Sequence, residues 1–463
     1  MEIRIENQVA EVTPELVKKY AVAAPRYTSY PTCPNWDRSW SADNYRRELE
    51  RSNETRRPLS LYFHIPFCEE RCTFCACSTI ATKKHEVAER YLASLLREME
   101  VTSGIVDGGR PVTQIHLGGG TPTYLSPTQI ERLFEALRFF FPVSPSAEIS
   151  VEIDPRVTTA DHLQTLKKVG VGRLSLGLQD FDERVQKAIG RIQSFEQTES
   201  VIRQARSAAF GGINCDLVYG LPGQTVESFR RTLELTVRLK PDRLSLFHFA
   251  HVPWLMPHQS AIDASTLPSS WQKLELFGEA IRILEGAGFV FIGLDHFARR
   301  DDALTKAFFS GDLHRNFQGY STHSGCDLIG LGITSISQLR DSYSQNVKRL
   351  KDYETILAEG SLPARSGMVL GEDDLIRQWV INELFCHLKI GKEAFYWRYH
   401  LPFDISFHDE KKSFEALEQD GLIRNEKQEF AVTPTGRFFL RNIAMAFDRY
   451  ARSSDTKRYS RVL

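Results

Sequence analysis

The chain has 463 residues, of which 42% are hydrophobic and 25% are charged, and its formal net charge is -1. This composition is typical of a globular protein with two or three domains, and the near-neutral charge argues against a nucleic-acid partner. The first twenty residues lack the apolar run of a secretory signal, and no stretch approaches a membrane span. We therefore expect a cytoplasmic protein whose cysteines are reduced.

Residues 1–57 precede the first regular pattern and are predicted to form an N-terminal extension, which contains PRYTSYPT at 25–32. From residue 58 to residue 370, short β-rich runs alternate with amphipathic segments long enough to be crossover helices. The runs are LSLYFHI (59–65), TQIHL (113–117), EISVEI (148–153), RLSLGL (173–178), NCDLVYG (214–220) and RLSLFHF (243–249). Six consecutive β/α units predict an α/β fold, with a parallel sheet curved into a full or partial TIM-type barrel.

One intervening helix carries a clear start signal. Ser126, Pro127 and Gln129 supply an N-cap, a proline at the first helical position and a capping-box partner, just ahead of IERLFEALRFFF. We predict a helix there, between the second and third strands.

Residues 371–463 are predicted to form a small, mostly helical C-terminal domain. DDLIRQWVINELFCHL has the spacing of an amphipathic helix. The segment from FEALEQDG onward has the pattern helix, short hairpin, helix, as in winged-helix domains. The near-neutral charge favours a packing or lid role over DNA binding.

Polar residues cluster where the predicted strands end, which is where β/α barrels carry their reactive groups. The candidates at these ends are Tyr62, His64, the glycines 118–120, Thr121, Glu152, Asp154, Gln179, Asp180, Asp216, His248 and Ala250. Any one of them could be a structural cap or salt-bridge partner, but their shared placement predicts a single site. We regard Tyr62, His64 and Glu152 as the catalytic candidates.

Four of the eight cysteines lie within the loop CEERCTFCAC at 68–77, directly after the first strand. Zinc sites usually add a second ligand pair a dozen or so residues away, and no such pair follows here. Cys68, Cys72 and Cys75 can instead each bind one iron of a 4Fe-4S cluster, which leaves the fourth iron open to a small molecule.

Cys77 leaves two alternatives open. As a fourth ligand it would close the cluster and make an electron-transfer module. Bringing its sulfur and that of Cys75 onto one cluster would require a tight turn, however, so we favour Cys77 as a non-ligand. The triple glycine in IHLGGGTP is a weak signal alone, but after the ligand loop it is consistent with a clamp for an amino-acid head group.

These motifs together resemble the radical S-adenosylmethionine (SAM) superfamily and, within it, the family of oxygen-independent coproporphyrinogen III oxidases. The resemblance extends over nearly the whole chain, through PRYTSYPT, LYFHIPFC, CEERCTFCAC, GGGTPTYL, VEIDPR, GLQDF, DLVYGLPGQT, DHFAR, LHRNFQGY and YSRVL. It implies a partial (β/α)6 barrel with a small C-terminal domain, a 4Fe-4S cluster and two SAM molecules. Ala76, where a glycine is expected, is a small departure.

The resemblance also implies roles for individual residues. Cys68, Cys72 and Cys75 would be the cluster ligands, with Cys77 a family marker. The first SAM would contact Tyr62, Gly119, Glu152 and Ile336. The second would contact Phe74, Gly120, Thr121, Gln179, Arg191, Asp216 and Ala250.

The implied reaction converts two propionate side chains of coproporphyrinogen III to vinyl groups through a 5'-deoxyadenosyl radical, giving protoporphyrinogen IX in haem biosynthesis. The resemblance further implies a monomer that receives electrons from a reduced flavodoxin-like or ferredoxin-like donor. Arg26, Tyr27 and Arg315 are candidate partners for the substrate's carboxylates. A haem-binding chaperone and a haem-ring-opening methyltransferase of the same superfamily are the alternatives. The chaperones generally lack PRYTSYPT and the Cys-x-Cys ending of the loop.

Overall fold

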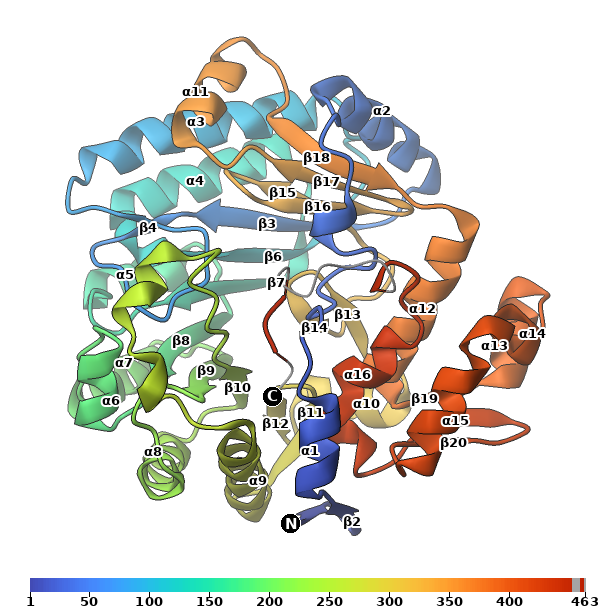
Figure 1. Ribbon diagram of the computed structural model, residues 1–463. Helices are drawn as coiled ribbons and strands as arrows, with labels where there is room; N and C mark the ends of the chain where they lie inside the picture. Colours follow the sequence, from blue (N-terminus) through green and yellow to red (C-terminus); the bar gives the residue numbers. More distant parts are fainter. Residues whose placement is uncertain (452–458, 462–463) are drawn as a thin grey trace.

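The structure, a computed structural model, describes residues 1–451 and 459–461. At its centre six parallel strands lie in the order β10-β9-β8-β7-β6-β3. Their bounds are β3 (Leu59–Ile65), β6 (Val112–Gly119), β7 (Val143–Ile153), β8 (Arg173–Gln179), β9 (Gly212–Tyr219) and β10 (Arg243–His248). All six predicted strands are therefore confirmed, and the sheet curves into a partial barrel (Figure 1).

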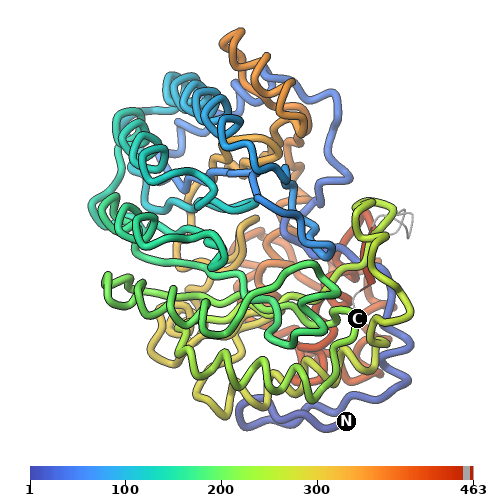
Figure 2. The backbone as a smooth tube through the Cα atoms, turned by 90° about the vertical axis from the view of Figure 1, so that its left-hand side faces the viewer, coloured from blue at the N-terminus to red at the C-terminus, as the bar shows by residue number. Residues whose placement is uncertain are grey.

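Helices between these strands cover the outer face of the sheet, where they follow one another in chain order (Figure 2). They are α3 (Glu86–Ser103), α4 (Pro127–Phe140), α5 (Ala160–Lys168), α6 (Glu183–Ala188), α7 (Phe195–Ser207) and α8 (Val226–Arg238). The predicted capping box of α4 is present: Gln129 N donates to Ser126 Oγ at 3.3 Å, and Ser126 N donates to Gln129 Oε1 at 2.9 Å. These helices leave the inner face of the sheet free for the site.

Further strands extend the sheet at both edges, where the sequence pattern was irregular. Next to β3 lie β15 (Asp327–Leu331), which is parallel to it, and then β16 (Ile336–Leu339), β17 (Ser342–Asn346) and β18 (Ala364–Val369), which are antiparallel. Next to β10 lies β12 (His296–Arg299), and next to β12 lies β11 (Phe289–Gly293); both pairings are antiparallel, and α9 (Ser270–Gly286) precedes these two strands. The segment between β12 and β15 contains α10 (Ala303–Ser310), β13 (His314–Asn316) and β14 (Gly319–Ser321), and α11 (Leu350–Ala358) precedes β18.

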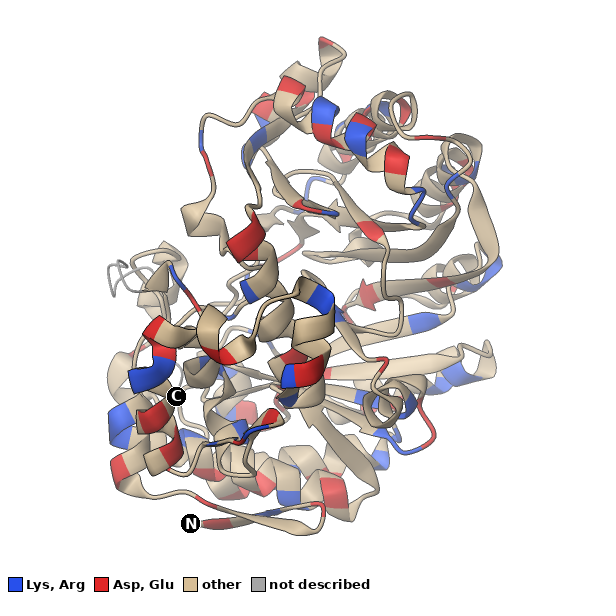
Figure 3. Ribbon diagram, turned by 90° about the vertical axis from the view of Figure 1, so that its right-hand side faces the viewer, with Lys and Arg blue, Asp and Glu red and all other residues tan. Residues whose placement is uncertain are grey.

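The C-terminal part lies on the open side of the sheet (Figure 1). A three-stranded antiparallel sheet in the order β19-β21-β20 packs with short helices, which confirms the predicted mostly helical, winged-helix-like character. The elements are α12 (Glu372–His387), β19 (Lys389–Gly391), α13 (Lys392–Tyr399), α14 (Phe403–Ser406), α15 (Lys411–Gln419), β20 (Ile423–Asn425), β21 (Glu429–Val432) and α16 (Leu440–Met445). Acidic and basic residues are interspersed over this part (Figure 3).

The N-terminal segment ties the sheet to the C-terminal part. Its elements are β1 (Glu2–Ile5), β2 (Gln8–Glu11), α1 (Pro14–Tyr20) and α2 (Ala42–Ser52). Within PRYTSYPT, the Tyr27 hydroxyl donates to Asp448 Oδ2 at 2.9 Å, and Arg441 Nε donates to the Pro25 carbonyl at 2.9 Å. None of the helices within the described residues has the length and apolar character needed to cross a bilayer.

A buried carboxyl group, Glu98, joins α3 to the β15 edge of the sheet. It accepts hydrogen bonds from Gly332 N at 2.7 Å, Asn346 Nδ2 at 2.6 Å and the Tyr353 hydroxyl at 2.5 Å. Burial raises the pKa of Glu98 to about 7, since a charge is poorly solvated there. The three bonds link segments far apart in sequence and stabilise the packing of α3 against the β15 edge of the sheet.

The raised pKa predicts a pH-dependent stability. The folded chain binds the Glu98 proton more tightly than the unfolded chain, so this contribution is present below pH 4.5 and is lost as the pH rises through about 7. We expect the free energy of unfolding to fall by roughly 3 kcal/mol over this range from this group. Denaturant titrations at several pH values measure it. Glu98→Gln should remove this part of the slope, with the exposed Glu100→Gln as the control on the same helix; an unchanged slope in Glu98→Gln would contradict the assignment.

Candidate active site

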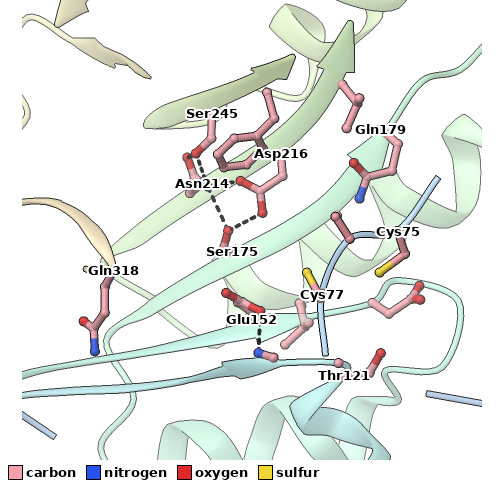
Figure 4. A pocket seen from close by; sticks show the side chains of 18 of the residues that line it. Cys75, Cys77, Thr121, Glu152, Ser175, Gln179, Asn214, Asp216, Ser245 and Gln318 are labelled. Atoms are coloured by element: carbon pink, nitrogen blue, oxygen red, sulfur yellow. Dashed lines mark hydrogen bonds between the residues drawn. The ribbon is translucent and has the colours of Figure 1, made fainter. Parts of the chain in front are cut away.

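The carboxyl ends of the six parallel strands surround one cavity of about 470 Å³. Five of the strands, β6 to β10, contribute to its lining, and the cysteine loop that follows β3 closes one end (Figure 4). The predicted convergence of strand-end residues is therefore observed. The expected residues that line it are Cys68, Cys72, Phe74, Cys75, Cys77, Gly119, Gly120, Thr121, Glu152, Asp154, Gln179, Arg191, Asp216, His248 and Ala250.

The cysteine loop is held by a small clip at its base and by contacts along its length. The clip pairs β4 (Phe67–Cys68) with β5 (Ile80–Ala81). Gln259 Nε2 donates to the Phe74 carbonyl at 2.9 Å, and His258 Nε2 lies 2.7 Å from the Cys75 carbonyl. Short loops without regular structure need such external bonds to present side chains in one direction, and this loop has them.

The donor set of the loop suits a multi-iron cluster better than a single metal ion. Among the described residues, no three His, Cys, Asp or Glu side chains converge on a point that one ion could occupy. In a 4Fe-4S cluster each thiolate binds a different iron, so three separated thiols at one end of a cavity are appropriate. Cys68 Sγ lies 3.4 Å from Thr121 Oγ1, and Arg191 Nη1 lies 3.9 Å from Cys72 Sγ. The guanidinium of Arg191 can therefore stabilise negative charge on the thiolate of Cys72.

Cys77 lies close to Cys75, an arrangement that according to the sequence analysis requires a tight turn. Its thiol forms a hydrogen bond with Cys75, which lowers the pKa of Cys75 to about 7 and, together with burial, raises the pKa of Cys77. The turn that this proximity requires is present, because the chain turns at 73–74 and bends at Cys77 instead of running extended. The need for a turn therefore does not decide whether Cys77 is a ligand.

The glycines after β6 provide space for close packing. A Cβ atom at Gly119, where φ is +116°, would meet the His64 ring at 2.6 Å, and one at Gly120 would meet the Phe67 carbonyl oxygen at 2.6 Å. The backbone amides are already bonded within the protein: Gly119 N donates to Glu152 Oε2 at 3.1 Å and Gly120 N to the Ile65 carbonyl at 2.8 Å. The glycines thus let the second strand end approach the cysteine loop.

Glu152 presents an ionised carboxylate to the cavity. Burial raises its pKa, but the hydrogen bond and positive charge of His116, 3.3 Å away, and the Gly119 amide outweigh burial, so the pKa lies below its usual value. The Glu152 side chain is 41% exposed, and the cavity is what it faces. A fixed carboxylate at this position suits a ligand ammonium group.

Tyr62 and His64 lie behind the cavity lining. The Tyr62 hydroxyl is 3.0 Å from His64 Nδ1, and His64 Nε2 is 2.9 Å from the Ser78 carbonyl at the end of the cysteine loop. Burial lowers the pKa of His64 and raises that of Tyr62. The structure thus places this pair where it supports the loop.

Two other expected residues lie away from the cavity. Ile336 is buried in an apolar cluster with Trp36, Tyr343 and Leu370. The Asp180 carboxylate is fully buried and accepts from Thr232 Oγ1 at 2.7 Å, so it is a structural group.

The inner face carries a polar network around Asp216, and the sequence analysis singled out none of its other members. Asp216 Oδ2 accepts from Ser175 Oγ at 2.8 Å, and Asp216 Oδ1 accepts from Asn214 Nδ2 at 2.8 Å (Figure 4). Asn214 also bonds Ser245 on β10. Burial raises the pKa of Asp216 to about 6. The sequence signal that could have identified this network is the alternation of polar and apolar residues along each strand, since every second residue points inward.

The parallel sheet with a cysteine loop after its first strand defines a radical SAM protein. Residues 62–236 match the Radical SAM superfamily, and residues 370–439 match the HemN C-terminal domain. This chain is 42% identical to the oxygen-independent coproporphyrinogen III oxidase of Synechocystis sp., over 98% of both chains. It is also 42% identical to the oxygen-independent coproporphyrinogen III oxidase of Escherichia coli K12, over 97% of this chain and 98% of that one.

A solved structure agrees with these comparisons. Coproporphyrinogen III oxidase (HemN) from Escherichia coli, described as a radical SAM enzyme, superimposes with a TM-score of 0.90 at 40% identity and covers 95% of this chain and 99% of its own. The chain belongs to the family of oxygen-independent coproporphyrinogen III oxidases. The resemblance inferred from its motifs is confirmed, and membership implies a 4Fe-4S cluster and SAM.

Proposed function

We propose that this protein converts coproporphyrinogen III to protoporphyrinogen IX by anaerobic oxidative decarboxylation of two propionate side chains. The observation that carries the proposal is the convergence of the three loop thiols and Glu152 on one cavity, in a chain that matches the named oxidases from end to end. Each event removes one hydrogen atom, one carbon dioxide and one electron from a propionate and leaves a vinyl group.

Cys68, Cys72 and Cys75 would hold the cluster at the closed end of the cavity, with Cys77 beside them as a non-ligand. The cluster and SAM, when bound, supply the electron and the carbon-centred radical that removes the hydrogen atom. Arg191 lies next to Cys72 and forms an ion pair with Asp154 at 2.9 Å, so it neutralises charge at this end of the cavity.

Two SAM molecules are supported by the extent of the polar lining. Glu152 and Gly119 would hold the first at the cluster, where the carboxylate pairs with its ammonium group. Tyr62 and His64 would act indirectly, by orienting the cysteine loop from behind the cavity lining. Ile336 would contribute a contact from β16. The second would contact the groups on the neighbouring strands, namely Phe74, Gly120, Thr121, Gln179, Arg191, Asp216 and Ala250.

The substrate would enter from the open side of the sheet, between the strand ends and the C-terminal part. Arg26 lines the cavity and can pair with a propionate carboxylate. Tyr27 is buried and bonded to Asp448, so it would act by fixing the N-terminal segment.

The cellular setting and the division into domains are proposals of the same kind. A monomer in the cytoplasm would receive single electrons from a reduced flavodoxin-like or ferredoxin-like donor. Residues 58–370 would form the catalytic barrel, with residues 1–57 as an extension and residues 371–463 as a helical domain. The eight free cysteines are consistent with a reducing compartment.

The test is anaerobic turnover of the cluster-loaded protein with coproporphyrinogen III, SAM and a one-electron reductant. We expect protoporphyrinogen IX and two molecules of carbon dioxide per substrate. Tight haem binding without this product would instead support a chaperone. A product that keeps all its carboxyl groups but has an opened ring would support a methyltransferase.

A further inference from the structure

A second cavity, of about 180 Å³, adjoins the first. It lies where α9, the β12–β14 region, α16 and the N-terminal segment meet (Figure 1). The two cavities share lining residues: Arg26, Phe247, His248, His296 and Gln318. We call this second cavity the annex. It lies beside the end of β10, and no residue of the cysteine loop lines it.

The annex is lined by five cationic side chains and one carboxylate. The cations are Arg26, Lys273, Arg315, Arg437 and Arg441, and the carboxylate is Asp295. Asp295 is already paired with His296 Nδ1 at 2.5 Å. Within the described part of the chain, none of the five cations forms an ion pair.

The bonds that these cations make go to neutral backbone carbonyls. Arg26 Nη2 donates to the His248 carbonyl at 2.6 Å, Arg437 Nη2 to that of Phe291 at 2.6 Å, and Arg315 to that of Tyr27. These carbonyls fix the guanidinium groups in place without neutralising them. Burial and then the charge of Arg26 lower the pKa of Arg441, and burial lowers that of Lys273 to about 8.

Unsatisfied polar atoms add a second sign of a ligand site. Both ring nitrogens of His248 and Nε of Arg437 are buried without a hydrogen-bond partner among the described residues. Buried donors without partners cost free energy, and so does a cation such as Arg315 that is buried and forms no ion pair with the residues that the structure describes. A carboxylate in the annex would satisfy both requirements at once.

We propose that the annex binds a second carboxylate of the substrate, the propionate next to the one that reacts. The inference rests on the proposed function. Neighbouring propionates are attached to the same porphyrinogen ring system. One can therefore reach the catalytic cavity while the other is held in the annex. The annex would thus set which propionate is presented to the reacting end.

Lys273 offers the cleanest test, because its ammonium group makes no hydrogen bond to a described residue and its removal breaks no internal contact of this kind. In Lys273→Met the side chain keeps most of its length and loses its charge. We expect the Kd of the cluster-loaded protein for coproporphyrin III, a fluorescent oxidised form of the substrate, to rise about tenfold. Lys273→Arg should restore most of the affinity. Lys306→Met, exposed on α10, is the matched control and should bind normally.

Two further arms identify the ligand. The tetramethyl ester of coproporphyrin III, which has the same ring and no carboxylate charge, should bind equally to Lys273→Met and the unaltered protein. SAM affinity, measured by calorimetry, should be unchanged. An unchanged Kd for coproporphyrin III in Lys273→Met would overturn the proposal, and so would a weakened affinity for SAM alone. Failure of the proposed function would appear separately, as absence of protoporphyrinogen IX from the unaltered protein.

Discussion

Replacing Cys72 by alanine is expected to abolish the 4Fe-4S cluster and all turnover. Cys72 is one of three thiols that close the end of the cavity, and Arg191 lies 3.9 Å from its sulfur. Three protein ligands are the minimum that holds a cubane with one open iron, so loss of one leaves two and the cluster dissociates. Iron and sulfide content and the visible absorbance of the anaerobically reconstituted protein measure the effect.

The comparison with Cys77→Ala separates the two models of the loop. We expect this variant to keep its full iron content, with reduced turnover at most, because in the proposed arrangement Cys77 contacts Cys75 and is not a ligand. Cys326→Ala, a half-buried cysteine outside the loop, is the control for loss of a thiol. Loss of the cluster in Cys77→Ala would show that all four cysteines bind it, and a full cluster spectrum in Cys72→Ala would contradict the ligand assignment.

Replacing Glu152 by glutamine is expected to weaken SAM binding by about tenfold to a hundredfold while the cluster stays intact. The change keeps the size of the side chain and removes the negative charge that faces the cavity. Because the pKa of Glu152 lies below its usual value, the carboxylate is ionised at neutral pH and the full charge is lost. Calorimetry with SAM measures the affinity, and turnover should fall in parallel.

Glu148→Gln is the matched control for this prediction. Glu148 lies on the same strand, β7, and lines the same cavity, where its carboxylate accepts from Gln114 Nε2 at 3.2 Å. We expect SAM affinity to change little in this variant. Equal losses in the two variants would mean that the overall negative charge of the cavity matters, and that Glu152 has no specific role.

The central strands were predictable because their signal is local. Runs such as 59–65 and 173–178 combine β-branched or leucine residues with an alternation that survives in a short window. The outer strands were not predictable in this way. For example, β16 has only four residues and follows a glycine-rich segment. Such short antiparallel strands are stabilised by pairing with neighbours, and a window of sequence does not contain the neighbour.

The same distinction applies to the site. The spacing of Cys68, Cys72 and Cys75 on one loop is visible in the sequence, as is the placement of Glu152 at a strand end. The network of Ser175, Asn214, Asp216 and Ser245 needs three strands, β8, β9 and β10, side by side before its hydrogen bonds exist. The supporting position of Tyr62 and His64 likewise depends on which face of β3 turns toward the cavity.

The sequence by itself determined the superfamily, the six parallel strands, the three-cysteine loop and the end of the sheet at which the site lies. Only the tertiary structure decided that Cys75 and Cys77 face one another across a bend, and that five cations from segments spread along the chain line one small annex. The physical reason is range. Ligand spacing and strand alternation are properties of neighbouring residues, whereas a cavity and its charge arise only when distant segments pack together.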